Sequence, residues 1–425
     1  MQALEERDYF TDHEILTDPY AWFEAIRARG PVYRPPGKDY LIVTGYAEAL
    51  QILGNFKDFS SSISLQGAGA PLPFTPTGAD ITADLESHRA QILGNDQVVN
   101  IDGQEHSALR SLLTPLFTPS RLKANEAFIA QYSDQLVCEA VKRGECELIK
   151  EIATPFVTLV IADLLGVPAA DRDFFIKVIE AAPPPGSLDQ SENAISEHHP
   201  FVVLGGYFRR YLQERRQNPR NDILTEFANA KYPDGSSPRL EDLVGLGTFL
   251  FAAGQDTSAK LLGNAMRYIV DQPGLQERLR QQPALIAPML EEVLRLEGSV
   301  KQTARLTIRD TRIGDTEVPA GTKILLALSA ANRDGKRWSN PEEFVVDRPK
   351  IKEHVAFGRG KHVCIGAPLA RAEVRIILEK FLQQTSEIEL AEDCHGPRGR
   401  RRLDFEPSFI IRGLSALRLK LTPAG

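Results

Sequence analysis

Residues 357–366 read Phe-Gly-Arg-Gly-Lys-His-Val-Cys-Ile-Gly, which is the most informative stretch of the sequence. Three glycines in ten residues allow the backbone to turn tightly around one cysteine, Cys364. The sequence from Ala367 onward is rich in Ala, Leu, Arg and Glu, which predicts a helix that begins just after the cysteine. Because backbone amides and the helix dipole stabilise a thiolate at such a position, we expect Cys364 to function as a thiolate.

Other interpretations of this stretch stay open at this point. A zinc site would need another ligand at a suitable spacing beside His354, His362 and Cys364. The glycines follow neither the dinucleotide-binding pattern nor the phosphate-loop pattern. A buried structural cysteine beside a turn is the simplest alternative to a functional thiolate.

The composition is that of a globular protein with a large core. The chain has 425 residues, of which 42% are apolar and 25% charged. Its net charge of −7 argues against a nucleic-acid-binding protein, which needs a dominant basic face. The charged opening sequence predicts neither a signal peptide nor a membrane anchor, and no apolar run of about 18 residues predicts a membrane span. Four cysteines without a C-x-x-C pair indicate a reducing cytoplasm.

The sequence periodicity predicts a mainly α fold with small peripheral β-sheets. Apolar residues over 121–138 recur at the helical spacings of three and four. Stretches that read as extended lie near the two ends of the chain, at 40–43, 323–328 and 408–411. We expect mobile loops at 67–78, 181–193 and 232–237. None of these loops resembles an interdomain linker, because helical patterns resume at once, so we expect a single domain over residues 1–425.

One long helix is predicted upstream of the cysteine. Ser237 is a good N-cap and Pro238 suits a first turn, so we expect the helix to run from there to Pro273. More than thirty residues would span roughly 50 Å at 1.5 Å per residue. The centre, residues 246–259, is mostly apolar, which is typical of a helix buried through the middle of a protein.

Three residues at the centre of this helix are poor helix formers. Gly254 costs about 1 kcal/mol relative to alanine, while Asp256 and Thr257 compete for backbone hydrogen bonds. In the middle of a buried helix such residues indicate function rather than packing. The alternative is a pair of satisfied polar residues in a helix kink.

The stretch 357–366 matches the F-x-x-G-x-x-x-C-x-G signature and therefore resembles the cytochrome P-450 family. Residues 253–257 resemble the family's oxygen-activation motif, A/G-G-x-D/E-T, and the flanking lengths suit a soluble bacterial member. Asp102 is followed by Gly-Gln-Glu-His rather than by the two prolines frequent in the family, which leaves the local loop conformation open. Further matches are the E-x-x-R motif at Glu292 and Arg295, residues 330–334, residues 341–344 with Arg348, and the C-helix pattern His106-x-x-x-Arg110.

The resemblance implies a haem b cofactor with Cys364 as the axial thiolate, whose electron donation favours O–O cleavage. It also implies that Thr257 hydrogen-bonds dioxygen and that Asp256 relays protons, so that a substrate C–H bond is hydroxylated. The remaining implied roles are packing around the sulfur for Phe357, Gly358, Gly360 and Gly366, propionate binding for His362, His106, Arg110 and Arg305, and a structural ion-pair network for Glu292, Arg295 and Arg348.

The position of the motifs also suggests a pocket for a small hydrophobic substrate, such as a terpenoid, aromatic or steroid-like molecule. Phe249 and Ala253 precede Thr257 by eight and four residues, so the three share one helix face. The other pocket candidates are Val300, Gln302, Ile410 and Ile411, with Phe74 and Ile81 in the roof segment 67–100.

Electrons must come from outside the chain, because it carries no flavin or iron–sulfur motif. We expect NAD(P)H, a ferredoxin reductase and a ferredoxin as the source, with Arg359, Lys361, Arg121 and Lys123 as a basic docking patch. A peroxide-driven peroxygenase and a haem-binding sensor without turnover are the alternative functions. The pair Asp256-Thr257 argues against both.

Overall fold

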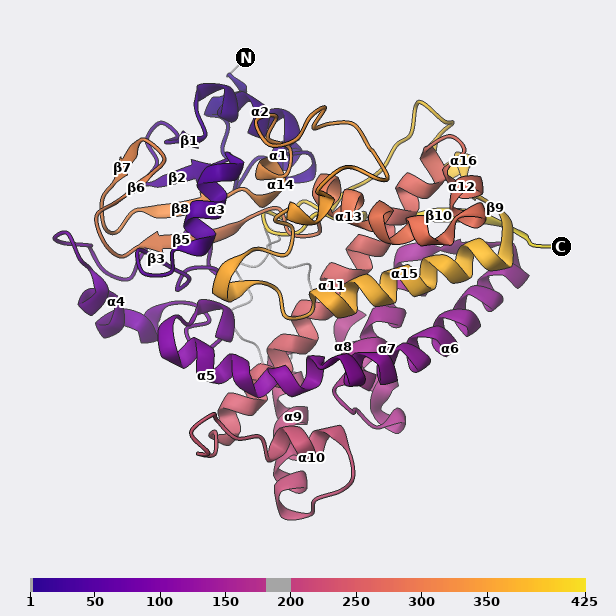
Figure 1. Cartoon of the computed structure of the whole chain (residues 1–425), viewed down its shortest axis with the longest axis horizontal. Helices are drawn as coiled ribbons and strands as arrows, with labels where there is room; N and C mark the ends of the chain where they lie inside the picture. The colour runs from indigo at the N-terminus through magenta and orange to yellow at the C-terminus, as the bar shows by residue number, and fades with distance from the viewer. Residues whose placement is uncertain (1–2, 181–199) are drawn as a thin grey trace.

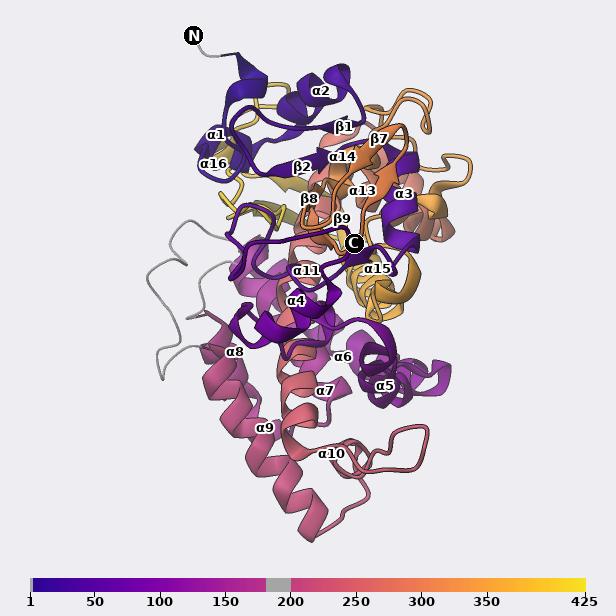
Figure 2. The same cartoon turned by 90° about the vertical axis from the view of Figure 1, so that its left-hand side faces the viewer.

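The computed structural model describes residues 3–180 and 200–425. Helices dominate it, and three small sheets accompany them (Figures 1 and 2), which confirms the predicted mainly α class. The loop expected at 181–193 lies outside the described residues, and the single-domain organisation stays a prediction. In the described part of the chain, no helix is both long and apolar enough to cross a membrane.

The long central helix is α11 (Leu240–Asp271), which has 32 residues. The predicted start at Ser237-Pro238 is wrong, because the helix begins three residues after Ser237 and Arg239 is its N-cap residue. The Ser237 hydroxyl accepts a hydrogen bond from Lys231 instead of capping the helix. The Arg239 backbone N–H donates to the Asp242 carboxylate over 3.2 Å, which closes the first turn.

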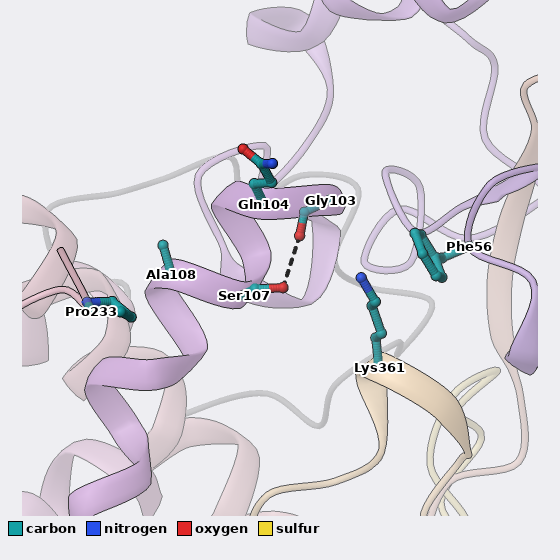
Figure 3. A pocket seen from close by; sticks show the side chains of 7 residues that line it. All are labelled: Phe56, Gly103, Gln104, Ser107, Ala108, Pro233 and Lys361. Carbon is teal, nitrogen blue, oxygen red and sulfur yellow. Dashed lines mark hydrogen bonds between the residues drawn. The ribbon is translucent and has the colours of Figure 1, made fainter.

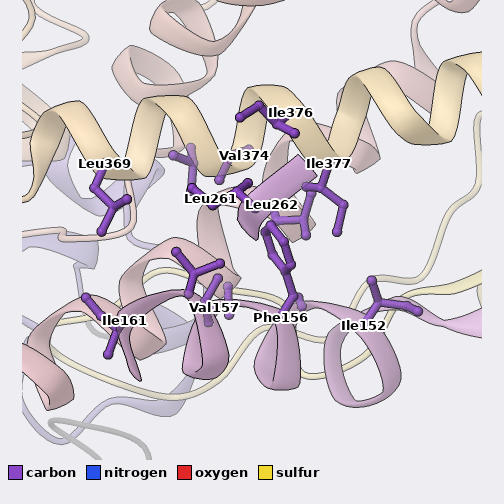
Figure 4. Packing of buried hydrophobic residues seen from close by; sticks show 14 of the residues in the cluster. Ile152, Phe156, Val157, Ile161, Leu261, Leu262, Leu369, Val374, Ile376 and Ile377 are labelled. Atoms are coloured by element: carbon purple, nitrogen blue, oxygen red, sulfur yellow. The ribbon is translucent and has the colours of Figure 1, made fainter. Parts of the chain in front are cut away.

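Among the described residues, the helices that pack most extensively on α11 are α7 (Thr154–Leu164), α9 (Pro200–Gln217), α13 (Ile286–Glu297) and α15 (Ala367–Gln384). The helix α6 (Pro119–Arg143) packs on α7 and α15. The helix predicted over 121–138 lies within α6. Figure 4 shows the centre of this core, where Phe156 and Val157 of α7, Leu261 and Leu262 of α11, and Val374 and Ile377 of α15 belong to one cluster. Burial of each such apolar side chain stabilises the fold by about 1.5–3 kcal/mol.

The other helices are shorter and several surround this core. They are α1 (His13–Thr17), α2 (Tyr20–Arg29), α3 (Tyr46–Gly54), α4 (Thr82–His88), α5 (Gly103–Leu113), α8 (Arg172–Glu180), α10 (Ile223–Ala228), α12 (Leu275–Gln281), α14 (Leu328–Ala331) and α16 (Glu392–His395).

The largest sheet has five strands in the order β1-β2-β8-β5-β3 and lies to one side of α11 (Figure 1). Its parallel pair β2–β8 confirms the strand predicted at 40–43 and the first four residues of the one predicted at 323–328, since β8 ends at Leu326 and Leu328 already begins α14. The extended stretch predicted at 408–411 is not a strand: Ile411 forms only an isolated bridge with Val300. The strands of this sheet are β1 (Val32–Tyr33), β2 (Tyr40–Val43), β3 (Phe59–Ser60), β5 (Thr303–Thr307) and β8 (Lys323–Leu326). A second sheet has the strand order β4 (Glu145–Glu147), β10 (Arg418–Pro423) and β9 (Thr385–Leu390). The third sheet is the hairpin of β6 (Thr311–Ile313) and β7 (Thr316–Val318).

Candidate functional site

The loop that carries Cys364 depends on two glycines with left-handed backbone conformation, Gly358 at φ 68° and Gly360 at φ 72°. A Cβ at Gly360 would collide with the carbonyl oxygen of Leu53, so the loop packs against α3 only with glycine there. The Cys364 N–H donates to the Phe357 carbonyl over 2.9 Å, which closes the loop. The loop then leads directly into α15.

The Cys364 sulfur lies at the N-terminal end of α15. Burial raises the pKa of the Cys364 thiol, whereas hydrogen bonds from the Gly366 and Ala367 amides and the charge of Arg110 lower it. The residue keeps solvent-accessible surface although protein groups surround it, as a side chain facing an internal cavity does. The Arg371 guanidinium covers the ring of neighbouring Phe357 at 4.6 Å from the centroid. Two amide donors aimed at a sulfur suit a thiolate ligand of haem iron.

A cluster of cationic side chains adjoins this loop. The rings of His106, on α5, and His362 lie 4.0 Å apart, and Arg110 donates to the Val363 carbonyl over 2.5 Å. Arg305 of β5 is buried and donates to the Ser64 hydroxyl over 3.0 Å. The four candidate propionate-binding residues thus come from α5, β5 and the cysteine loop.

The pKa values of this cluster are shifted mainly by burial, and among the described residues Asp102 is the carboxylate that acts on His106, Arg305 and His362. Burial lowers the pKa of His106 to about 4 and that of Arg305 to about 10, and it also lowers the pKa values of Arg110 and His362. Asp102 contacts His362 at 3.2 Å, but its oxygens also accept hydrogen bonds from residues 60 and 61. Two propionate groups would add negative charge beside these side chains, so the residues present fit haem.

The residues of the 253–257 motif lie near the middle of α11. Ala253 is exposed although it lies at the middle of a central helix, which indicates that it faces an internal space. The Thr257 hydroxyl donates to the Ala253 carbonyl over 2.9 Å, and its own carbonyl accepts from Ser299 over 2.7 Å. A Cβ at Gly254 would lie 2.7 Å from the Ile161 side chain, so glycine permits close packing of α7.

Asp256 points away from bulk solvent. Burial raises its pKa to about 6, although the Lys260 ammonium, 3.8 Å from Oδ1, lowers it. A carboxyl group with this pKa exchanges its proton near neutral pH, as a general acid requires.

Sequence reasoning missed Glu373, a second buried carboxyl on α15. It is 3% exposed, burial raises its pKa to about 8, and the side chain of Ser258 on α11 hydrogen-bonds to it. The signal was present in the periodicity: Glu373 interrupts the apolar face that Leu369 and Ile377 continue at i−4 and i+4.

The proposed ion-pair network is assembled behind the cysteine loop. The Glu292 carboxylate contacts Arg295 at 2.8 Å and Arg348 at 2.9 Å, and both carboxylate and Arg295 are fully buried. Arg295 also donates to the carbonyls of Asn332 and Pro341 over 2.9 and 2.7 Å. The network joins α13 to the segment that precedes the cysteine loop.

The substrate-pocket candidates do not all share one environment. Val300 and Ile411 form a bridge, and the Ile410 carbonyl accepts from Lys301 over 2.7 Å. The Oε1 atom of Gln302 is buried and has no hydrogen-bond partner among the described residues. The candidates Phe249 and Ala253 lie on α11, Phe74 stacks on His88 of α4 at 5.1 Å, and Ile81 is buried.

The surface beside the cation cluster is hollowed by a cavity of about 360 Å³ (Figure 3). Lys361 lies at its edge, where its Nζ atom covers the Phe56 ring at 3.8 Å. Of the other predicted docking residues, Arg359 donates to the Lys352 carbonyl over 2.8 Å and Lys123 is exposed. Arg121 forms an ion pair with Glu226, which neutralises its charge.

The zinc site considered for His354, His362 and Cys364 has no complete ligand set. In residues 3–180 and 200–425, no three His, Cys, Asp or Glu side chains are grouped to hold a metal ion. The Nε2 atom of His354 instead lies 3.0 Å from the Glu291 carboxylate.

Comparison with known proteins points to one family. The cytochrome P450 family model matches residues 196–388. The chain is 44% identical to Mycobacterium marinum cytochrome P450 CYP150A6 in the substrate-free form, with a TM-score of 0.92 and coverage of 100% of both chains. It is 31% identical to cytochrome P450 144 of Mycobacterium tuberculosis over 99% of this chain and 92% of that protein. It is 26% identical to CYP109E1 from Bacillus megaterium in complex with corticosterone, with a TM-score of 0.79 over 96% and 99% of the chains.

Proposed function

The chain belongs to the cytochrome P450 family of haem b monooxygenases, and we propose that it hydroxylates a small hydrophobic substrate with Cys364 as the axial iron ligand. The observation that carries this proposal is the cysteine loop, whose amides converge on one sulfur beside a cluster of basic side chains. Haem bound there would activate dioxygen. In the overall reaction, dioxygen takes up two electrons and two protons, one oxygen atom is inserted into a substrate C–H bond, and the other leaves as water.

The residues that carry out this task lie on the cysteine loop with its neighbouring basic cluster and on α11. Amides of residues 366 and 367 stabilise the Cys364 thiolate. His106, Arg110, His362 and Arg305 bind the two propionates and fix the orientation of the cofactor.

On α11, Asp256 and Thr257 supply protons. The pKa of Asp256, about 6, lets it release a proton and take one up again near neutral pH. The Thr257 hydroxyl donates to the Ala253 carbonyl, and once this hydrogen bond breaks it is free to donate to a molecule bound beside α11.

The proposed substrate class follows from the chemical character of the substrate-pocket candidates. Phe249 and Ala253 on α11 and Val300 beside the sheet are apolar or small, which favours a terpenoid, aromatic or steroid-like molecule. The similar CYP109E1 holds a steroid, corticosterone.

Electrons reach the site from a ferredoxin that a reductase reduces with NAD(P)H. The docking surface comprises Arg359, Lys361 and Lys123, while Arg121 contributes little because Glu226 pairs with it.

The experiment that tests this function is Thr257→Ala in the holoenzyme. NADH consumed, hydrogen peroxide formed and product formed are measured in one assay with a ferredoxin system and a hydrophobic substrate identified by spectral binding. We expect haem content and substrate affinity to persist while electrons go to hydrogen peroxide instead of product. Thr248→Ala on the same helix is the control, since Thr248 is buried nine residues earlier. Wild-type coupling in Thr257→Ala would refute the proposed role, and product formed with peroxide alone would indicate a peroxygenase.

A further inference from the structure

Asp256 is not the only carboxylate close to the Lys260 ammonium. Lys260 lies one turn after Asp256 on α11, and its side chain is 6% exposed. The Nζ atom lies 3.8 Å from Asp256 Oδ1 and forms a much closer ion pair with Oε1 of Glu406, 146 residues later in the chain. Among the described residues, Lys260 and Glu406 are the charged groups that act on Asp256, from α11 itself and from the C-terminal loop.

The backbone of the C-terminal loop holds Glu406 in this position. Phe405 and Leu414 form an isolated antiparallel bridge, and the Glu406 N–H donates to the Gly413 carbonyl over 3.0 Å. The Lys260 side chain passes directly over Gly413: a Cβ there would lie 2.8 Å from the Lys260 Cβ and closer still to Cγ and Cδ. The loop is therefore shaped to admit this lysine.

Each carboxylate also has a buried oxygen atom that lacks a donor. Oδ2 of Asp256 and Oε2 of Glu406 have no hydrogen-bond partner among the described residues. Buried carboxylate oxygens are almost always hydrogen-bonded, to a water molecule or as a protonated hydroxyl. Two carboxylates and one ammonium together carry one negative charge, which a single bound proton neutralises.

We propose that Asp256, Lys260 and Glu406 form one proton-holding unit, in which Glu406 keeps the proton on Asp256 by engaging the Lys260 ammonium. Glu406 is thus a positioning residue and Asp256 the proton donor; this division rests on the function proposed above. When the Asp256 O–H bond breaks and the proton is delivered, the Lys260 ammonium stabilises the new carboxylate, and a proton from solvent restores the acid. The division of roles follows from the distances, since the Lys260 ammonium lies nearer to Glu406 than to Asp256 and therefore stabilises a charge on Asp256 less.

The test is an infrared titration of the holoenzyme, which reads the protonated carboxyl directly and needs no turnover. The band of Asp256 is identified by its loss in Asp256→Asn. In Glu406→Gln the ammonium becomes free to pair with Asp256, so we expect the band to titrate lower by roughly one pH unit or more. Lys260→Met should move it to higher pH, and Gly413→Ala, which changes no charge but displaces the lysine, should do the same. Glu389→Gln on β9, an exposed acid, should have no effect.

An Asp256 band that titrates identically in wild type, Glu406→Gln and Gly413→Ala would overturn the proposal. Glu406→Asp keeps the charge and should restore the wild-type titration, which separates an electrostatic effect from a loss of folding. If the band shifts as expected but Asp256→Asn retains wild-type turnover and coupling, the unit exists and it is the proposed role of Asp256 in oxygen activation that fails.

Discussion

Glu373→Gln should make this protein more stable at alkaline pH, although it removes a buried polar contact. Burial raises the pKa of Glu373 to about 8 from its ordinary value of 4.5, and the Ser258 hydrogen bond offsets this only in part. In the folded protein the carboxyl group is therefore protonated at neutral pH, whereas in the unfolded chain it is ionised. Folding must take up a proton at this position.

The direction and the magnitude of the effect on folding stability follow from the folded-state pKa and the ordinary pKa of Glu373. Because the folded-state pKa is raised, the contribution of Glu373 to stability is complete below about pH 4.5 and is lost as the pH rises to about 8. The whole interval corresponds to about 5 kcal/mol, taken as the upper limit for a fully buried carboxyl. Glutamine has nearly the same shape and no charge to lose, so the variant should keep the stability that wild type has in acid.

The measurement is the free energy of unfolding in denaturant, followed by circular dichroism on the holoenzymes at about pH 5 and about pH 9. Wild type should lose several kcal/mol relative to Glu373→Gln between the two values. Glu379→Gln is the control on the same helix, because Glu379 is partly exposed and pairs with Arg375 at 2.7 Å. Parallel pH dependence of wild type and Glu373→Gln would refute a protonated buried Glu373.

Three other changes test separate parts of the protein. Glu292→Gln leaves Arg295 buried without a carboxylate and should cost about 3–5 kcal/mol in denaturant unfolding; an unchanged midpoint would show that the network does not stabilise the fold. Cys364→His should abolish the thiolate-type absorption band of the reduced carbon monoxide complex, and survival of the band would exclude Cys364 as ligand. Lys361→Glu should slow ferredoxin-dependent reduction and weaken its salt dependence without changing substrate affinity; equal rates across ionic strengths would reject the docking surface.

Local features of this protein could be predicted from the sequence because residue type sets local backbone geometry. The glycines at 358 and 360 adopt the left-handed conformation that a tight loop requires. The apolar periodicity correctly predicted a central helix of more than thirty residues, and the continuous apolar stretch at 40–43 is a strand. These features depend on neighbours within a few positions of the chain.

Other features depend on tertiary packing, because it brings together residues that are far apart in the sequence and whose contacts no local sequence pattern predicts. The central helix begins at Leu240 with Arg239 as its N-cap, and the Ser237 hydroxyl accepts a hydrogen bond from Lys231 instead of capping the helix. Arg121, which was predicted as a docking residue, forms an ion pair with Glu226, an acid more than a hundred positions later. Lys260 and Glu406 are 146 positions apart in the sequence, and only the fold places them in contact. Such contacts depend on how whole elements pack, and burial then changes the pKa values of the groups they enclose.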